Sequence, residues 1–163
     1  MIFAFTGHRP AHMPWGTQED DPRCQALKLL LKKTVLSAYE SGCRTFLCGM
    51  ARGCDLYFAE IVLSLRDSGV CPEATLTAML PCPSQTSRWN ASEQRRQAAL
   101  VRRCDCVRVL EDAYSDGCML RRNRMMVDEC DCLITVFDGR QGGTAATVRY
   151  AARRGKTVIP LWR

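Results

Sequence analysis

Six short apolar runs alternate with segments of helix length along the whole chain, and this alternation limits the choice of fold more than any other feature. Each run is almost continuously apolar, which is typical of parallel strands covered on both faces. Strands that alternate with helices form βαβ units, and right-handed crossovers between them produce an open, doubly wound sheet. The predicted strands are residues 2–6, 45–48, 75–80, 106–110, 132–137 and 157–161.

Capping signals mark the ends of the helices between these strands. Asp21, followed by Pro22, begins the first helix, and Asn90 begins the third. We therefore expect one α/β domain over residues 1–163, with a Rossmann-like, mainly parallel sheet of about six strands and helices on both faces. The hydrophobic content of 47% is enough for one core. Four of the five predicted helices cover about residues 22–41, 54–68, 118–129 and 143–154, and the third of the five starts after residue 90.

The charge and the cysteine content limit the class of binding partner and the cellular compartment that we expect. The chain has 23 Lys and Arg against 17 Asp and Glu, a formal net charge of +6, which favours an anionic partner such as a nucleotide or a nucleic acid. No apolar run has the length of a signal-peptide core or a membrane span, so we expect a cytoplasmic protein with no membrane contact. The 11 cysteines are then expected to be reduced thiols, and several of them, such as Cys48, Cys106 and Cys132, are expected to pack as small apolar residues.

Two closely spaced cysteine pairs raise the alternative of a zinc site. Cys104 and Cys106 are separated by one residue, and so are Cys130 and Cys132. The cysteines of a structural zinc site are usually separated by about two to four residues. We therefore expect core packing and no metal.

Loops that follow strand ends carry the chemistry. In doubly wound sheets, ligands bind outside the carboxyl ends of the strands, where the strand order reverses. Residues 49–55 and 138–144 each join a strand directly to a helix and contain two or more glycines. Such loops let amide N–H groups converge on a phosphate at the positive helix end. Neither loop has the sequence of a Walker P-loop or of the dinucleotide fingerprint.

Several side chains near these loops can be interpreted either as ligand contacts or as structural groups. Arg52 offers a bidentate grip on phosphate, and Asp55 either caps its helix or accepts a ribose hydroxyl. Trp89 and Tyr114 either stack a base or hold their own loops by burial. In the segment 121–124, residues 121 and 124 share one helical face, so a solvated basic face is the alternative to a ligand contact.

Five short motifs together resemble the SLOG (SMF/DprA–LOG) superfamily and, within it, the short YpsA-like branch. They occur in family order and extend over nearly the whole chain: Thr6-Gly7-His8-Arg9-Pro10, Gly49-Met50-Ala51-Arg52-Gly53-Cys54-Asp55 with Ala59-Glu60, Pro81 to Trp89, Arg122-Asn123, and Gly142-Gly143-Thr144.

This resemblance implies a nucleotide-binding fold in which both glycine loops hold the ligand. It also extends to the core of DprA, which binds single-stranded DNA and loads a recombinase. LOG enzymes hydrolyse the N-glycosidic bond of nucleoside monophosphates with an arginine, matched here by Arg122, and a glutamate, whose position is Thr147. Threonine has no charge to stabilise an oxocarbenium-like centre, so this departure argues against LOG-type hydrolysis.

The leading hypothesis is a protein that binds a nucleotide or a nucleotide derivative such as ADP-ribose, as a sensor or a nucleotide-processing enzyme. The alternatives are a DprA-like module for single-stranded DNA, a LOG-like nucleoside monophosphate phosphoribohydrolase and, last, a cysteine-based metal or redox protein. Whether a reaction is catalysed and whether the chain forms a homodimer stay open, and a nucleotide-type ligand is the only cofactor suggested. The candidate catalytic residues are Arg122, Asp55 and Glu60. The expected ligand-binding residues are Thr6, Gly7, His8, Arg9, Gly49, Met50, Ala51, Arg52, Gly53, Asp55, Pro81, Trp89, Arg122, Asn123, Asp138, Gly142, Gly143 and Thr144.

Overall fold

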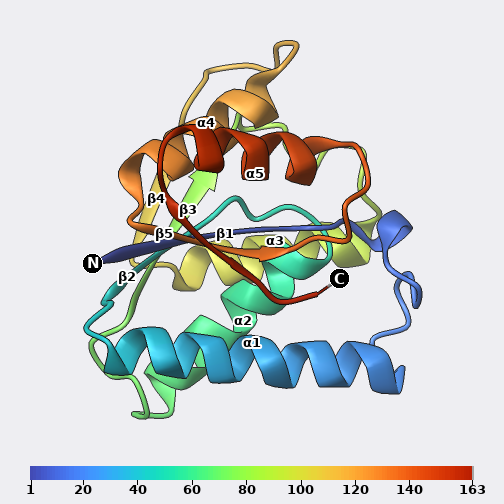
Figure 1. The fold of residues 1–163 in the computed structure, drawn as a ribbon. Helices are drawn as coiled ribbons and strands as arrows, with labels where there is room; N and C mark the ends of the chain where they lie inside the picture. The colour runs from blue at the N-terminus through green and yellow to red at the C-terminus, as the bar shows by residue number, and fades with distance from the viewer. Residues whose placement is uncertain (163) are drawn as a thin grey trace.

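The computed structural model describes residues 1–162 and contains one six-stranded sheet in which all neighbouring strands are parallel (Figure 1). The predicted α/β fold is thus confirmed, and each predicted strand is present with an end shifted by one residue at most. The strands are β1 (Ile2–Gly7), β2 (Thr45–Cys48), β3 (Thr75–Leu80), β4 (Cys106–Val109), β5 (Cys132–Val136) and β6 (Thr157–Pro160).

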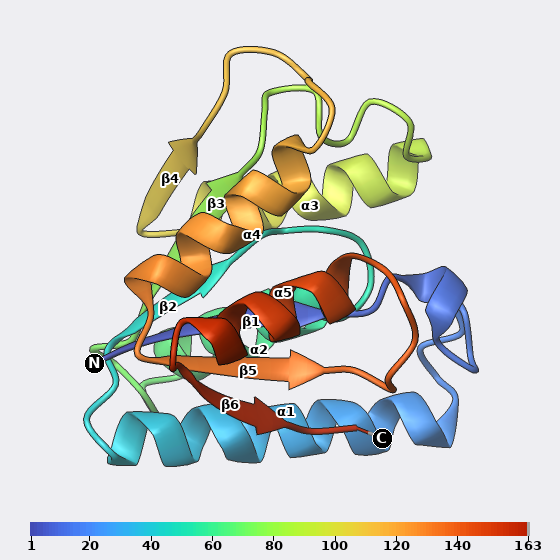
Figure 2. The same ribbon diagram turned by 45° about the horizontal axis from the view of Figure 1, so that its top comes forward.

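The helices cover the sheet in two layers (Figure 2). One layer contains α1, α2 and α3, whose apolar side chains pack in the larger core, and the other contains α4 and α5, which pack on the smaller core. Asp21 caps α1 by accepting the N–H of Arg23 at 2.8 Å, and Asn90 caps α3 by accepting the N–H of Glu93 at 2.9 Å. The helices are α1 (Pro22–Glu40), α2 (Cys54–Asp67), α3 (Ala91–Arg103), α4 (Cys118–Glu129) and α5 (Gly143–Arg153).

The strand order is β4-β3-β2-β1-β5-β6, so the direction of winding reverses at β1. The chain first moves outward from β1 to β4, then crosses back through α4 and adds β5 on the other side of β1. Loops that leave β1 and β5 therefore diverge to opposite faces of the sheet. A crevice at the carboxyl ends of these two strands is the expected consequence.

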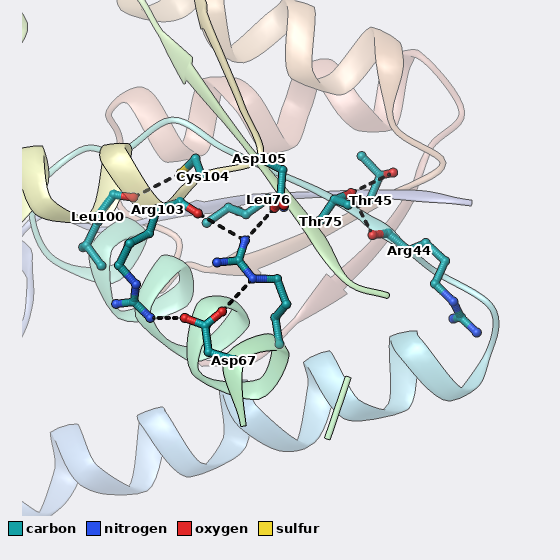
Figure 3. Close-up of polar contacts among 10 residues, drawn as sticks. Arg44, Thr45, Asp67, Thr75, Leu76, Leu100, Arg103, Cys104 and Asp105 are labelled. Carbon is teal, nitrogen blue, oxygen red and sulfur yellow. Dashed lines mark hydrogen bonds and ion pairs between the residues drawn. The ribbon is translucent and has the colours of Figure 1, made fainter. Parts of the chain in front are cut away.

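The amino ends of β3 and β4 are closed by a cluster of ion pairs (Figure 3). Arg66 lies 2.8 Å from carboxylate oxygens of both Asp67 and Asp105, and Arg103 reaches Asp67 at 2.8 Å. The carboxylate of Asp105 also accepts the N–H of Leu76, the second residue of β3, at 2.8 Å. These side chains are exposed enough that each pair contributes little stability alone. Together they occupy the edge of the sheet opposite the crevice.

Two properties of the described chain bear on its surroundings. Within residues 1–162 no helix combines the length and the apolar character needed to cross a bilayer. All 11 cysteines are free thiols, and the expected burial of Cys48 is confirmed. The expectation is wrong for Cys106, which is exposed because β4 is an edge strand, and Cys132 is half-buried. The buried cysteines are Cys24, Cys43, Cys48, Cys54, Cys71, Cys82, Cys118 and Cys130.

Candidate functional site

A cavity of about 390 Å³ opens at the carboxyl edge of the sheet, beside the end of β1 and between the first turns of α4 and α5. Its volume lies within the usual range for small-molecule sites, roughly 300–1,000 Å³. The strand-order reversal creates it, because the loops after β1 and β5 separate here. The lining residues are Thr6, Gly7, His8, Arg9, His12, Ala51, Asp55, Met119, Leu120, Arg122, Asn123, Arg140, Gln141, Gly142, Gly143, Thr144 and Ala146.

The start of α5 forms one wall of this cavity. Its N-cap is Gly142, whose φ of 147° favours glycine, and no side chain within residues 1–162 caps the helix. The first amide N–H groups of a helix have no partner inside it and carry the positive end of the helix dipole. Gly143 and Thr144 bring these groups to the cavity, and the hydroxyl-bearing Thr6, only 5% exposed, lines it from β1. This wall is suited to an anion.

The start of α2, on the other side of β1, is already occupied by the protein itself. The Asp55 carboxylate accepts the N–H of Ala51 at 3.1 Å, and the carbonyl of His8 accepts the N–H of Cys54 at 3.2 Å. Burial raises the pKa of Asp55 to about 6, although the Arg122 charge and the N–H groups of Ala51 and Gly7 oppose this rise. The loop 49–53 therefore holds a carboxylate where a phosphate was expected.

Arg122 is the buried cation of the site, with 3% of its surface exposed. Its Nη1 donates to the carbonyl of Gly49 and, at 3.0 Å, to the carbonyl of Met79, so it joins α4 to the ends of β2 and β3. A Cβ at position 49 would lie 2.6 Å from the Arg122 Cζ, which explains the glycine there. Burial lowers the pKa of Arg122, and the negative charge of Asp55 counteracts this.

Asn123 connects this arginine to α5. Its Oδ1 accepts the Nε of Arg122 at 2.7 Å, and its Nδ2 donates to the Thr147 hydroxyl at 3.0 Å. That hydroxyl donates in turn to the carbonyl of Gly143 at 2.8 Å. Thr147, which stands where the resemblance places a glutamate, is 2% exposed and belongs to the helix scaffold.

A second polar pair lies at the rim. The Nε2 of His8 is 2.8 Å from the Oδ1 of Asp138, and Arg140 contacts the same carboxylate through its backbone N–H at 3.1 Å and its Nε at 2.9 Å. Burial alone would raise the pKa of Asp138, but the hydrogen bonds from Arg140 and His8 outweigh it and leave this pKa lowered. Asp138 thus orients two lining residues without lining the cavity itself.

The structure brings together eleven of the expected ligand-binding residues around this cavity and places seven elsewhere. Gly49, Met50 and Gly53 shape the loop before α2, and Pro81 is buried. The residues that line the cavity are Thr6, Gly7, His8, Arg9, Ala51, Asp55, Arg122, Asn123, Gly142, Gly143 and Thr144; those outside it are Gly49, Met50, Arg52, Gly53, Pro81, Trp89 and Asp138.

Two of the expected charged residues have partners outside the cavity. Arg52 pairs with Glu93 at 3.2 Å, and its guanidinium lies 5.9 Å from the centroid of the Trp89 ring. Glu60, a candidate catalytic acid, pairs with Arg96 at 2.7 Å. Asp55 is consequently the one candidate carboxylate that lines the cavity within residues 1–162.

Sequence reasoning missed six lining residues. Arg140 and Gln141 belong to the glycine loop 138–144, which was predicted to bind the ligand. Their place in that loop could have identified them. Met119 and Leu120 carried no such signal, because the crossover from β4 brings the start of α4 to the cavity. The full set is His12, Met119, Leu120, Arg140, Gln141 and Ala146.

Across residues 1–162, no three His, Cys, Asp or Glu side chains gather in a way that would hold a metal ion. The polar side chains that line the cavity are mainly cations, hydroxyls and amides, which are the partners of an anionic ligand.

These features define a Rossmann-like domain with an open helix start beside the strand-order reversal. Residues 3–157 match the family model YpsA, described as the YspA SLOG family, and the chain therefore belongs to this family.

Similar proteins carry the name UPF0398. The UPF0398 protein of Bacillus pumilus (strain SAFR-032) is 26% identical over 145 residues, which are 88% of this chain and 76% of the relative. The UPF0398 protein of Levilactobacillus brevis is 27% identical over 136 residues, 82% of this chain and 70% of the relative.

Among solved structures, the chain is similar to DNA processing protein A from Helicobacter pylori, described for its single-stranded DNA binding mode. The match has a TM-score of 0.63 and 15% sequence identity, and it covers 98% of this chain. It covers 64% of the other chain, so this protein spans less than two thirds of that length. At this identity the likeness shows the fold alone.

Proposed function

We propose that the protein binds a nucleotide or a nucleotide derivative, with a ligand phosphate at the start of α5. The observation that carries this proposal is an uncapped helix start that faces a cavity also lined by Thr6, Arg9 and Arg140. Backbone N–H groups and guanidinium groups are strong partners for phosphate, and an anion at a helix start is favoured by the dipole. Membership of the SLOG family supports the same class of ligand.

The sugar of such a ligand has partners deeper in the cavity. The buried carboxylate of Asp55 lines it and has lone pairs beyond those used by the N–H groups of the chain. The proposal gives Asp55 the role of hydroxyl acceptor, which the sequence left open beside capping. It gives Arg122 the role of holding the cavity floor rigid, since its donors already reach two strand ends.

Binding without LOG-type hydrolysis is the better supported form of this proposal. The glutamate position holds Thr147, and its hydroxyl is hydrogen-bonded inside α5. Free thiols throughout the chain fit a reducing compartment, so the proposal places this binding in the cytoplasm.

Thermal denaturation in the presence of AMP, ADP-ribose, pyrophosphate and adenosine tests the proposal. A ligand that binds only the folded state raises the midpoint, and it does so more strongly the higher its affinity. The three phosphate compounds should raise the midpoint, whereas adenosine, which has no phosphate, should not. Equal stabilisation by adenosine, or no stabilisation by any compound, would contradict the proposal.

Single-stranded DNA is the second candidate ligand, favoured by the net charge of +6 and by the fold shared with DNA processing protein A. Fluorescence anisotropy with a labelled oligothymidine at increasing salt separates it from the first. Binding through phosphate contacts should weaken steeply with salt, because counterions are released. Undetectable binding at low salt would remove this candidate.

A further inference from the structure

A second hollow of about 460 Å³ adjoins the cavity on the side of the β3 and β4 loops. Arg9 and Met119 line both spaces, and the Nη2 of Arg9 donates to the Met119 sulfur at 2.9 Å. This contact forms the ridge between them. A flexible arginine and a thioether are joined here only by a weak acceptor, so a ligand can displace them at low cost. The two hollows are therefore neighbouring compartments of one groove.

Two aromatic side chains from different loops line the second hollow. Trp89, from the loop after β3, is half-buried and packs against the larger core, and Tyr114, from the loop after β4, is 62% exposed. Arg52 lies between Glu93 and the Trp89 ring, and these contacts fix both the Arg52 guanidinium and the ring in place. Flat, sequence-distant aromatic groups that face one hollow form a stacking platform for a planar ring.

The polar groups around this platform suit the hydrogen-bonding edge of a base and the negative charge of a phosphate. Ser84 and Ser87 supply hydroxyls, and Arg88 has no ion-pair partner within the described residues 1–162. The Gln85 amide is already committed, since it donates to the carbonyl of Gly49 at 2.9 Å and accepts from Gln97 at 3.4 Å. The hollow thus combines aromatic faces, cations and hydroxyls, whereas the first cavity offers a helix start.

We infer that the second hollow binds the nucleobase of the ligand whose phosphate lies at the start of α5. This inference rests on the proposed function and makes it narrower: the ligand is a nucleoside phosphate, and a sugar phosphate without a base occupies only half of the groove. Trp89 and Tyr114 act as specificity-determining residues. Arg9, on the ridge, contacts the ligand between its two ends.

Calorimetry with two probes, AMP and ribose 5-phosphate, tests the inference. A stacked base contributes about tenfold or more to affinity, so AMP should bind at least about tenfold more tightly. Tyr114→Ala should reduce this AMP preference severalfold, and Tyr114→Phe, which keeps the ring, should retain it. Because Tyr114 is exposed, both variants are expected to fold. Val70→Ala, which truncates a 56% exposed apolar side chain that lines neither hollow, is the control and should leave the preference unchanged.

The outcomes separate this inference from the proposed function. Equal affinity for AMP and ribose 5-phosphate overturns the base subsite and leaves the phosphate site standing. An AMP preference that survives both Tyr114→Ala and Trp89→Ala also overturns it, because the base then lies elsewhere. Binding of neither probe overturns both proposals at once.

Discussion

Two helix starts flank β1 in this protein, and they have opposite fates. The start of α2 follows a glycine loop, but the chain fills it with the Asp55 carboxylate and the His8 carbonyl. The start of α5 follows a similar loop. Neither helix has a side-chain cap within residues 1–162, but at α5 no carbonyl of another loop accepts the first amide N–H groups. The comparison shows that a glycine loop alone does not define an anion site. The difference lies in the neighbouring groups: at α2 the His8 carbonyl accepts the first helical N–H group, and Asp55 accepts an N–H group of the preceding loop.

Gly→Ala substitutions in the two loops should have the most unequal effects. Gly49→Ala places a Cβ 2.6 Å from Arg122 and breaks its bonds to two strand ends, which we expect to cost about 4 kcal/mol of stability. Gly143→Ala meets no atom within 4 Å, and we expect a change of about 0.5 kcal/mol or less. Urea unfolding measures both. Equal losses would mean that the two loops are packed alike.

The Asp55 carboxyl should make stability depend on pH. Its pKa rises from the ordinary 3.8 to about 6 on folding, so the folded state binds the proton more tightly. Stability from this group is therefore complete below about pH 4 and is lost as the pH rises through about 6. We expect a loss of about 3 kcal/mol, because a difference of one between the folded and unfolded pKa corresponds to about 1.4 kcal/mol.

Asp55→Asn is the matching variant, because it keeps the shape and cannot ionise. The stability difference between the wild type and this variant, measured by urea unfolding, should therefore change by about this amount from pH 4 to pH 7. Carboxyls with a lowered pKa, such as Glu19 and Glu111, gain stability over the same range, but they do so in both proteins. A stability difference that is the same at pH 4 and pH 6.5 would contradict the assignment.

Arg140 should matter for ligand affinity and not for folding, since its side chain is 61% exposed and faces the α5 side of the cavity. Arg140→Ala should weaken AMP binding by about tenfold, the usual effect of losing one charge-assisted hydrogen bond. Arg102→Ala, an exposed arginine near the end of α3, is the control in the same calorimetric titration. An identical effect of the two substitutions would indicate general charge attraction.

The smallest effect is the most direct test of the difference between the two helix starts. Pyrophosphate should shift the amide signals of Gly143 and Thr144 in nitrogen–proton NMR spectra, because phosphate oxygens accept hydrogen bonds from N–H groups at a helix start. The amide of Ala51 should shift little, since it already donates to Asp55. A larger shift at Ala51 would reverse the roles of the two loops.

The fold was predictable because every level of the sequence agreed. The apolar runs, the cap at Asp21 and the cap at Asn90 all indicate the same α/β alternation, and the structure contains each of them. The order of the strands could not be deduced from these local signals, since it depends on how crossovers place β5 beside β1.

The candidate site was predictable where a loop follows directly from a strand. Gly142, Gly143 and Thr144 belong to such a loop and line the cavity. Arg52 belongs to one as well, but Glu93 on α3 draws its side chain away, and that contact spans 41 residues of sequence. A contact between residues so distant in the chain cannot be predicted from the local sequence around either of them.

The contact between Gly49 and Arg122 ties together two positions that are distant in the chain. Any residue larger than glycine at position 49 would need a shorter side chain at 122, and a shorter side chain at 122 would leave two strand-end carbonyls without this donor. Across the family, we therefore expect the residue types at these two positions to change only together, even in members that bind a different ligand.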